Sequence, residues 1–164
     1  MLEINIRIFF PKKGNSLFPD YHEHLKLLEP LDGQIRTCLD GAEAAPIYQY
    51  YTISPLGWVE SRYLRRMRLG KSVMCIREDL LEYTNSIHVP GIFRQLLYQY
   101  LKMYLNSLDY IVVKNQAVED KLKKEGVSSP IFVKIPEKDE ENSIKGAYTW
   151  LNLYKKIETI QQKF

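Results

Sequence analysis

The feature that most constrains the fold is an alternation of apolar strands with charged helices. It is clearest in residues 109–136, where the apolar run DYIVVK leads into the helical pattern QAVEDKLKKE. Gly126 ends that helix, and a second apolar run, PIFVKIP, follows. A strand that is apolar on both sides has to be covered by helices on both faces of its sheet. The pattern therefore predicts an α/β protein with a single Rossmann-like, doubly wound, mainly parallel sheet.

The same alternation divides the rest of the chain. Residues 1–136 are predicted to form one Rossmann-like domain, and residues 137–144 an acidic linker. Residues 145–164 are predicted to form a helix that packs on the sheet. The expected strands are residues 2–10, 34–39, 45–53 and 71–77, and the expected helices are 21–31, 57–68 and 92–108. The expected contacts of the last helix are Trp150, Leu151, Leu153, Tyr154 and Ile157.

Helical spacing also predicts which side chains face inward. In the helix at 57–68, Val59, Tyr63, Leu64 and Met67 are expected to pack against the sheet. Residues 78–91 are expected to be irregular, with single helical turns. The shared apolar face of the helix at 92–108 is expected to contain Ile92, Leu96, Tyr100, Tyr104 and Leu108, beside Leu97, Leu101 and Leu105.

Composition excludes several classes of protein. A net charge of +3 does not by itself indicate nucleic-acid binding, and no nucleic-acid partner is expected. Cys38 and Cys75 lie in apolar runs, so both are predicted to be buried, free thiols of a reducing compartment. His22 and His24 are two residues apart and point to different sides of a helix, so no metal site and no cofactor are expected. No apolar run reaches the roughly 18 residues of a spanning helix, which favours a cytoplasmic protein, free or peripheral on the inner face of the membrane.

The clearest charge feature is the helical stretch GWVESRYLRRMRLGK, residues 57–71, in which five cations accompany a single acid, Glu60. An exposed basic stripe with an aromatic ring at its rim suits anionic lipid headgroups, which attract each nearby cation with about 1 kcal/mol. An ordinary solvated helix face is the alternative interpretation. The predicted membrane-binding residues are Trp58, Arg62, Arg65, Arg66, Arg68 and Lys71.

The loop after the first strand, PKKGNSLFPD, is the place where a Rossmann-like unit binds phosphate. Closely spaced glycines normally let backbone amides approach the anion there. This loop has one glycine, Gly14, preceded by Lys12 and Lys13, which could hold an anion. A solvated surface loop is the alternative interpretation, because a lone glycine is a weak fingerprint.

The order of several stretches resembles the N-terminal half of bacterial GT-B-fold glycosyltransferases of family 4, near those that glucosylate diacylglycerol. QYYTISPLGWVESRYLRRMRLGKSV is similar to the family's third strand, helix and fourth strand, and REDLLEYTNSI to its acidic-aromatic segment. Residues 89–136 are similar to its long helix, its strand-to-helix turn and the strand that leads into its second domain. AYTWLNLYKKI resembles the helix that crosses back onto the first domain.

The resemblance implies an acceptor-side site and also reveals departures from the family. Of the family's histidine turn only Thr52 is retained, and the position of its acceptor-side histidine is taken by Arg77. Arg77, Glu78 and Glu82 are the candidate catalytic residues that the resemblance implies. The glycine-rich loop is reduced to Lys13-Gly14-Asn15. We expect the chain to lack the second domain, which in the family binds the sugar nucleotide.

Three functions stay open at this point. The first is a glycosyltransferase-like acceptor-side domain without its own sugar-nucleotide site, accessory, regulatory or membrane-docking in lipid or cell-envelope glycosylation, and inactive alone. Its partners would be a full-length glycosyltransferase and an anionic membrane surface. The second is an active half-subunit that pairs with a separate donor-binding domain. The third is a small α/β ligand-binding domain unrelated to glycosylation.

Overall fold

The strands form one parallel sheet, as the alternating pattern predicts. A computed structural model describes residues 1–9, 20–133 and 144–161. Within these residues the sheet has six strands in the order β2-β1-β3-β4-β5-β6, every pair parallel. The strands are β1 (Leu2–Arg7), β2 (Ile35–Leu39), β3 (Ile47–Tyr50), β4 (Lys71–Ile76), β5 (Tyr110–Val113) and β6 (Ile131–Val133).

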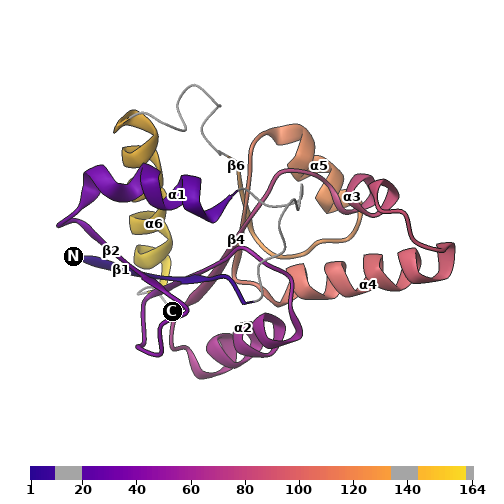
Figure 1. Cartoon of the computed structure of the whole chain (residues 1–164), viewed down its shortest axis with the longest axis horizontal. Helices are drawn as coiled ribbons and strands as arrows, with labels where there is room; N and C mark the ends of the chain where they lie inside the picture. The colour runs from indigo at the N-terminus through magenta and orange to yellow at the C-terminus, as the bar shows by residue number, and fades with distance from the viewer. Residues whose placement is uncertain (10–19, 134–143, 162–164) are drawn as a thin grey trace.

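Helices cover both faces of this sheet (Figure 1). The α1/α6 face holds one apolar core, to which β1 contributes Leu2, Ile4 and Ile6. Because side chains alternate along a strand, Asn5 and Arg7 point to the opposite, α2/α4 face, whose separate core includes Tyr50 and Met74. The helices are α1 (Tyr21–Leu28), α2 (Pro55–Met67), α3 (Leu80–Ser86), α4 (Gly91–Ser107), α5 (Gln116–Lys124) and α6 (Ile144–Gln161), with a 3₁₀ turn, η1 (Glu29–Leu31), after α1.

The chain reverses its direction of winding at β1. It first steps from β1 to β2 through α1, and then passes back over β1 to reach β3. The second connection is short, and polar side chains of β1 hold it on the α2/α4 face. Asn5 Nδ2 donates to Gly41 O (2.9 Å) and Arg7 Nη1 donates to the same carbonyl (2.7 Å). The carboxyl ends of β1 and β3 therefore form the topological switch point, where ligands of open α/β sheets bind.

The helix predicted at residues 145–164 packs on the sheet, as expected. In α6, Trp150, Leu151, Tyr154 and Ile157 are buried in the α1/α6 core, and Leu153 packs against its edge. In Figure 1 the helix crosses behind α1, which it contacts. Residues 134–143, which include most of the predicted acidic linker, lie outside the described residues.

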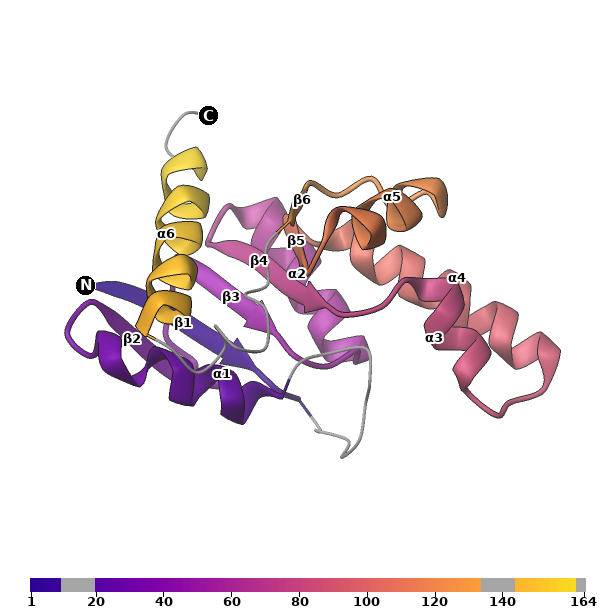
Figure 2. The same cartoon turned by 90° about the horizontal axis from the view of Figure 1, so that it is seen from above.

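The segment predicted to be irregular, residues 78–91, contains the helix α3. Its N-terminus is capped by Asp79, whose carboxylate accepts a hydrogen bond from Glu82 N (2.9 Å). Helices α3 and α4 form a hairpin that projects beyond the sheet (Figure 2). The predicted inward face of α4 is therefore wrong over its first half, since Ile92 and Leu96 are exposed. Its second half packs as expected, with Leu101, Tyr104 and Leu105 buried.

The inward face of α2 also differs from the prediction. Leu64 is buried, but Val59, Tyr63 and Met67 are exposed. Their places next to the sheet and α4 are taken by small residues, Gly57 and Ser61. Ser61 Oγ lies 2.9 Å from Ser107 Oγ of α4, and a Cβ atom at Gly57 would collide with the Tyr104 hydroxyl. The two helices approach so closely that only small side chains fit between them.

The prediction for the cysteines is correct for one of the two. Cys75 of β4 is buried, and burial raises the pKa of its thiol to about 12. Cys38 is exposed because β2 is an edge strand. Its register partner Asn5 places it on the α2/α4 face, where no helix of the described residues covers β2.

Candidate functional site

The predicted acceptor-side residues lie at the carboxyl ends of the strands but do not converge. Arg77 follows β4 and reaches toward α1, with Nη2 3.8 Å from Glu23 Oε2. Glu82 lies on α3 and faces α5, with Oε2 3.6 Å from Lys121 Nζ. Glu78, between them in sequence, is half-buried. Arg77 and Glu82 therefore point to opposite neighbours and make no common site.

The switch-point residues that could be assigned to phosphate binding are described only in part. Lys12, Lys13 and Gly14 lie outside the described residues. Thr52 follows β3 and is half-buried, and its Oγ1 donates to Phe9 O (3.2 Å). This hydrogen bond joins the two segments that leave β1 and β3. Thr52 thus has a structural partner at the switch point.

A cluster of charged residues that the sequence analysis missed stabilises the start of α3. Asp79 is buried and accepts from Lys121 Nζ (3.0 Å) as well as from Glu82 N. Glu125, at the end of α5, accepts from Leu80 N (3.1 Å) and Leu81 N (2.9 Å). Burial acts to raise the pKa of Asp79, but its hydrogen bonds outweigh burial and lower it, whereas burial raises the pKa of Glu125. Both carboxylates accept hydrogen bonds from the α3 backbone, so their main role is structural.

A chain of buried polar groups connects α6 to the centre of the sheet. The Tyr154 hydroxyl lies 2.8 Å from His24 Nε2, with which it shares a hydrogen bond, and 3.4 Å from Gln49 Oε1. Gln49 Nε2 in turn donates to Cys75 Sγ (3.1 Å). Burial lowers the pKa of His24 to about 3, so the ring is neutral near pH 7. His24 is therefore a neutral, buried member of this hydrogen-bonded chain, and its ring packs edge-on against the rings of Trp150 and Tyr154.

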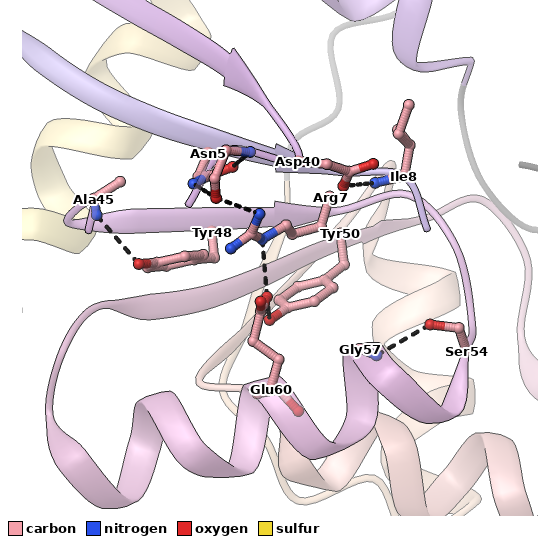
Figure 3. A network of polar contacts seen from close by, with 12 residues as sticks. Asn5, Arg7, Ile8, Asp40, Ala45, Tyr48, Tyr50, Ser54, Gly57 and Glu60 are labelled. Atoms are coloured by element: carbon pink, nitrogen blue, oxygen red, sulfur yellow. Dashed lines mark hydrogen bonds and ion pairs between the residues drawn. The ribbon is translucent and has the colours of Figure 1, made fainter. Parts of the chain in front are cut away.

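A second buried network fixes the orientation of α2 (Figure 3). Glu60 Oε1 accepts from Arg7 Nε (2.9 Å) and from the Tyr50 hydroxyl (2.6 Å). Arg7 is almost fully buried, and its guanidinium also lies 5.1 Å from the ring centre of Tyr48. Burial and the bond to Glu60 together raise the pKa of Tyr50. The network turns the one acidic side chain of α2 toward the sheet, away from the outer surface of the helix.

The predicted basic stripe is consequently exposed without an acidic neighbour on α2. Arg62, Arg65 and Arg66 are all exposed, and the Arg62 guanidinium lies 5.1 Å from the ring centre of Trp58. Trp58 itself is half-buried against the α2/α4 core. Arg68 is exposed at the C-terminal end of α2, and Lys71 is half-buried at the start of β4. The stripe is therefore made by three arginines, with Arg68 and Lys71 beyond its end.

Neither a cavity nor a cluster of metal ligands among the described residues adds a ligand site to the carboxyl ends of the strands. A cavity of about 100 Å³ lies over β1 and β2, lined by Asn5, Cys38 and their neighbours, and contains none of the predicted site residues. It is smaller than the roughly 300 Å³ from which drug-sized ligand sites begin. Within the described ranges, no three histidine, cysteine, aspartate or glutamate side chains gather closely enough to hold a metal ion. None of the helices in these ranges has the combination of length and hydropathy that a bilayer-spanning segment requires.

Comparison of the chain with protein-family models, with curated proteins and with solved structures finds no match.

Proposed function

We propose that the protein is a glycosyltransferase-like acceptor-side domain that docks on an anionic membrane surface. It acts beside a complete glycosyltransferase, or a separate donor-binding domain, in lipid or cell-envelope glycosylation, peripheral on the inner face of the membrane. The parallel sheet with its switch point at β1 and β3, and the return of α6 to the α1/α6 face, support the GT-B-like part of the proposal. The sequence resemblance supports it independently.

The observation that carries the docking part is the uncompensated basic stripe on α2. Arg62, Arg65 and Arg66 are exposed, while Glu60 is held inward by Arg7 and Tyr50. Because the Glu60 carboxylate is paired with Arg7 and Tyr50, it does not offset the arginines, and the outer surface of α2 attracts anions. The phosphate groups of a lipid bilayer form an extended anionic surface. A helix of this length can contact that surface along its whole basic stripe.

Vesicle co-sedimentation tests this docking directly. The protein should bind vesicles that contain an anionic phospholipid and should be released by salt. Replacing three exposed arginines (R62Q/R65Q/R66Q) should lower the affinity about a hundredfold, since each cation near the surface contributes about 1 kcal/mol. The matched control is K26Q/K124Q/K155Q, which removes the same charge from exposed sites elsewhere. Equal losses in the two variants would mean that net charge, and not the stripe, drives binding.

Calorimetric titration with UDP-sugars tests the accessory role. The proposal describes an acceptor-side domain without its own sugar-nucleotide site. It therefore expects no affinity tighter than about millimolar. A micromolar affinity for a sugar nucleotide would refute the accessory role.

A further inference from the structure

The outer surface of the helix pair α2–α4 carries apolar side chains as well as the basic stripe. On α2, Leu56, Val59, Tyr63 and Met67 follow one another at intervals of three or four residues, so they lie along one side of the helix. Each of them is between 52% and 58% exposed. A surface helix usually hides such a row against the core. Here the core side is occupied by Gly57, Ser61 and Leu64 instead.

A second exposed apolar row runs along α4. Ile92 is 71% exposed, Leu96 61% and Phe93 60%, and Met103 continues the row toward the sheet. Ile92, Phe93 and Leu96 lie in the first half of α4 (Gly91–Ser107), on the part of the α3–α4 hairpin that projects beyond the sheet (Figures 1 and 2). The sequence of α4 contains no aspartate or glutamate. Its exposed surface therefore carries no negative charge, and the polar side chains exposed beside the apolar row are Gln95 and Gln99.

Arg62 and Arg65 lie toward the side of α2 that faces α4, whereas Arg66, three residues after Tyr63, lies beside the apolar row. Arg65 Nη1 donates to Asn106 O of α4 (3.4 Å). The Arg62 guanidinium lies over the ring of Trp58. Trp58 follows Gly57, the residue of α2 that lies next to Tyr104 of α4. Helical spacing puts Arg62 and Arg65 on that flank and the row of Val59, Tyr63 and Met67 on the other. The outer surface of the pair thus has Arg62 and Arg65 between the two apolar rows, with Arg66 at the border of the α2 row. We call it the α2–α4 surface.

We propose that the α2–α4 surface inserts into an anionic lipid bilayer, with its apolar rows at the boundary of headgroups and acyl chains. The arginines then lie at the level of the lipid phosphates, as in helices that lie in a membrane interface. The inference rests on the proposed docking function and adds to it a hydrophobic anchor, centred on Ile92 and Phe93. It also orients the protein, because the anchor is linked through α3 to the carboxyl end of β4, where Arg77 and Glu78 lie.

Charge complementarity distinguishes the bilayer from a second copy of the protein. In a symmetric dimer through this surface, Arg62, Arg65 and Arg66 would face their own copies, and neither α2 nor α4 offers an exposed acid to pair them. A bilayer supplies phosphates for the cations and hydrocarbon for both apolar rows. A bilayer also contacts a surface two helices wide without needing a complementary shape.

Fluorescence quenching by lipids tests the insertion. In F93W the new indole should be quenched by anionic vesicles whose acyl chains carry bromine, and its emission should shift to shorter wavelength. The matched control is Y148W, which puts an indole at an exposed site on α6, remote from the α2–α4 surface. It should show neither change. Wild-type protein, which contains Trp58 and Trp150, provides the background signal.

Salt separates the anchor from the electrostatic attraction. At about 1 M salt, where charges are screened beyond about 3 Å, wild-type protein should keep part of its vesicle binding. The pair I92S/F93S should lose that salt-resistant part, about tenfold or more in partitioning, because two large side chains no longer enter the interface. The control I144S/Y148S changes a similarly exposed pair on α6 and should behave as wild type.

The outcomes tell the anchor and the docking apart. If F93W is not quenched while R62Q/R65Q/R66Q still abolishes vesicle binding, the insertion is refuted and electrostatic docking stands. If wild-type protein binds no anionic vesicle, both proposals are refuted. If I92S/F93S instead converts a dimer to a monomer in sedimentation analysis and leaves vesicle binding unchanged, the surface joins two copies and the insertion is refuted. Quenching in F93W alone, with salt-resistant binding lost in I92S/F93S, supports it.

Discussion

The two helical layers of this protein cover the same sheet in opposite ways. On the α1/α6 face, large aromatic side chains such as Trp150 and Tyr154 point inward and are buried. On the α2/α4 face, the helix α2 turns small residues, Gly57 and Ser61, toward its neighbours and leaves Tyr63 outside. The α1/α6 layer therefore buries its large aromatic side chains, whereas the α2/α4 layer buries some large side chains and leaves others, on α2 and in the first half of α4, at the surface.

The difference shows how stability and binding are divided between the layers. The α1/α6 layer is tied by the buried contacts of His24, Tyr154 and Gln49. The α2/α4 layer has its own apolar core and, in addition, close polar contacts, including Arg7–Glu60 and Ser61–Ser107. Substitutions of large residues should thus have large effects on folding in the first layer. In the exposed rows of the second they should chiefly affect binding.

Removal of α6 is the most severe test of this division. Deleting residues 147–164 should expose the α1/α6 core, and the chain should aggregate, because several large buried side chains are lost from a fold that has about 5–15 kcal/mol in all. Solubility and the thermal transition by circular dichroism measure the effect. A deletion variant with an unchanged melting temperature would contradict the role assigned to α6.

A pair of single substitutions compares the layers directly. Trp150→Ala should lower the free energy of unfolding by about 3–5 kcal/mol, because it leaves a cavity beside His24 and Tyr154. Leu96→Ala, on the exposed row of α4, should change it by less than about 0.5 kcal/mol. Urea denaturation of both variants gives the two values. Similar losses would mean that the α4 row is buried in solution.

Adding a side chain where α2 and α4 approach closely should lower stability by less than Trp150→Ala does. The cause here is overpacking and not a cavity. Gly57→Ala should destabilise the protein by about 1–3 kcal/mol, since its methyl group collides with the Tyr104 hydroxyl. Gly91→Ala is the matched control, because a Cβ atom there meets no atom within 4 Å. Chemical denaturation should rank Gly57→Ala below wild type and Gly91→Ala at or above it. The reverse order would refute the close packing.

The buried histidine makes the stability of the protein depend on pH. Unfolded chains take up a proton on histidine below about pH 6.5, whereas His24 in the folded protein stays neutral until about pH 3. Stability is therefore complete above pH 6.5 and is lost as the pH falls. Between pH 7 and 5.5 the loss should be about 1 kcal/mol. In His24→Gln this loss should disappear, while the exposed control His22→Gln should keep it.

The fold could be predicted from the sequence because its strands carry their own signal. The run of Tyr110–Val113 is apolar on both sides, which only a sheet covered on both faces can bury. The contacts of α6 were equally predictable from the spacing of Trp150, Tyr154 and Ile157. In these segments one arrangement alone buries all the large side chains, so local pattern and tertiary structure agree.

The prediction failed where a helix has two apolar sides. On α2 the row of Val59, Tyr63 and Met67 looked like the buried side, and only the position of Tyr104 on another helix decides against it. The inward turn of Glu60 depends in the same way on Arg7, 53 residues away. Asp79 is different, since an aspartate three residues before Glu82 is a capping pattern visible in the sequence. That signal was present and was overlooked.

The long-range contact between α1 and α6 has a consequence for synthesis on the ribosome. His24 and Tyr154 are 130 residues apart, so at about 5–20 residues per second roughly 7–26 s pass between the appearance of one and of the other. During that interval the side of β1 that carries Leu2, Ile4 and Ile6 has no α6 to cover it. The nascent chain therefore displays an apolar sheet surface for many seconds, which makes it a substrate for chaperones that bind such surfaces.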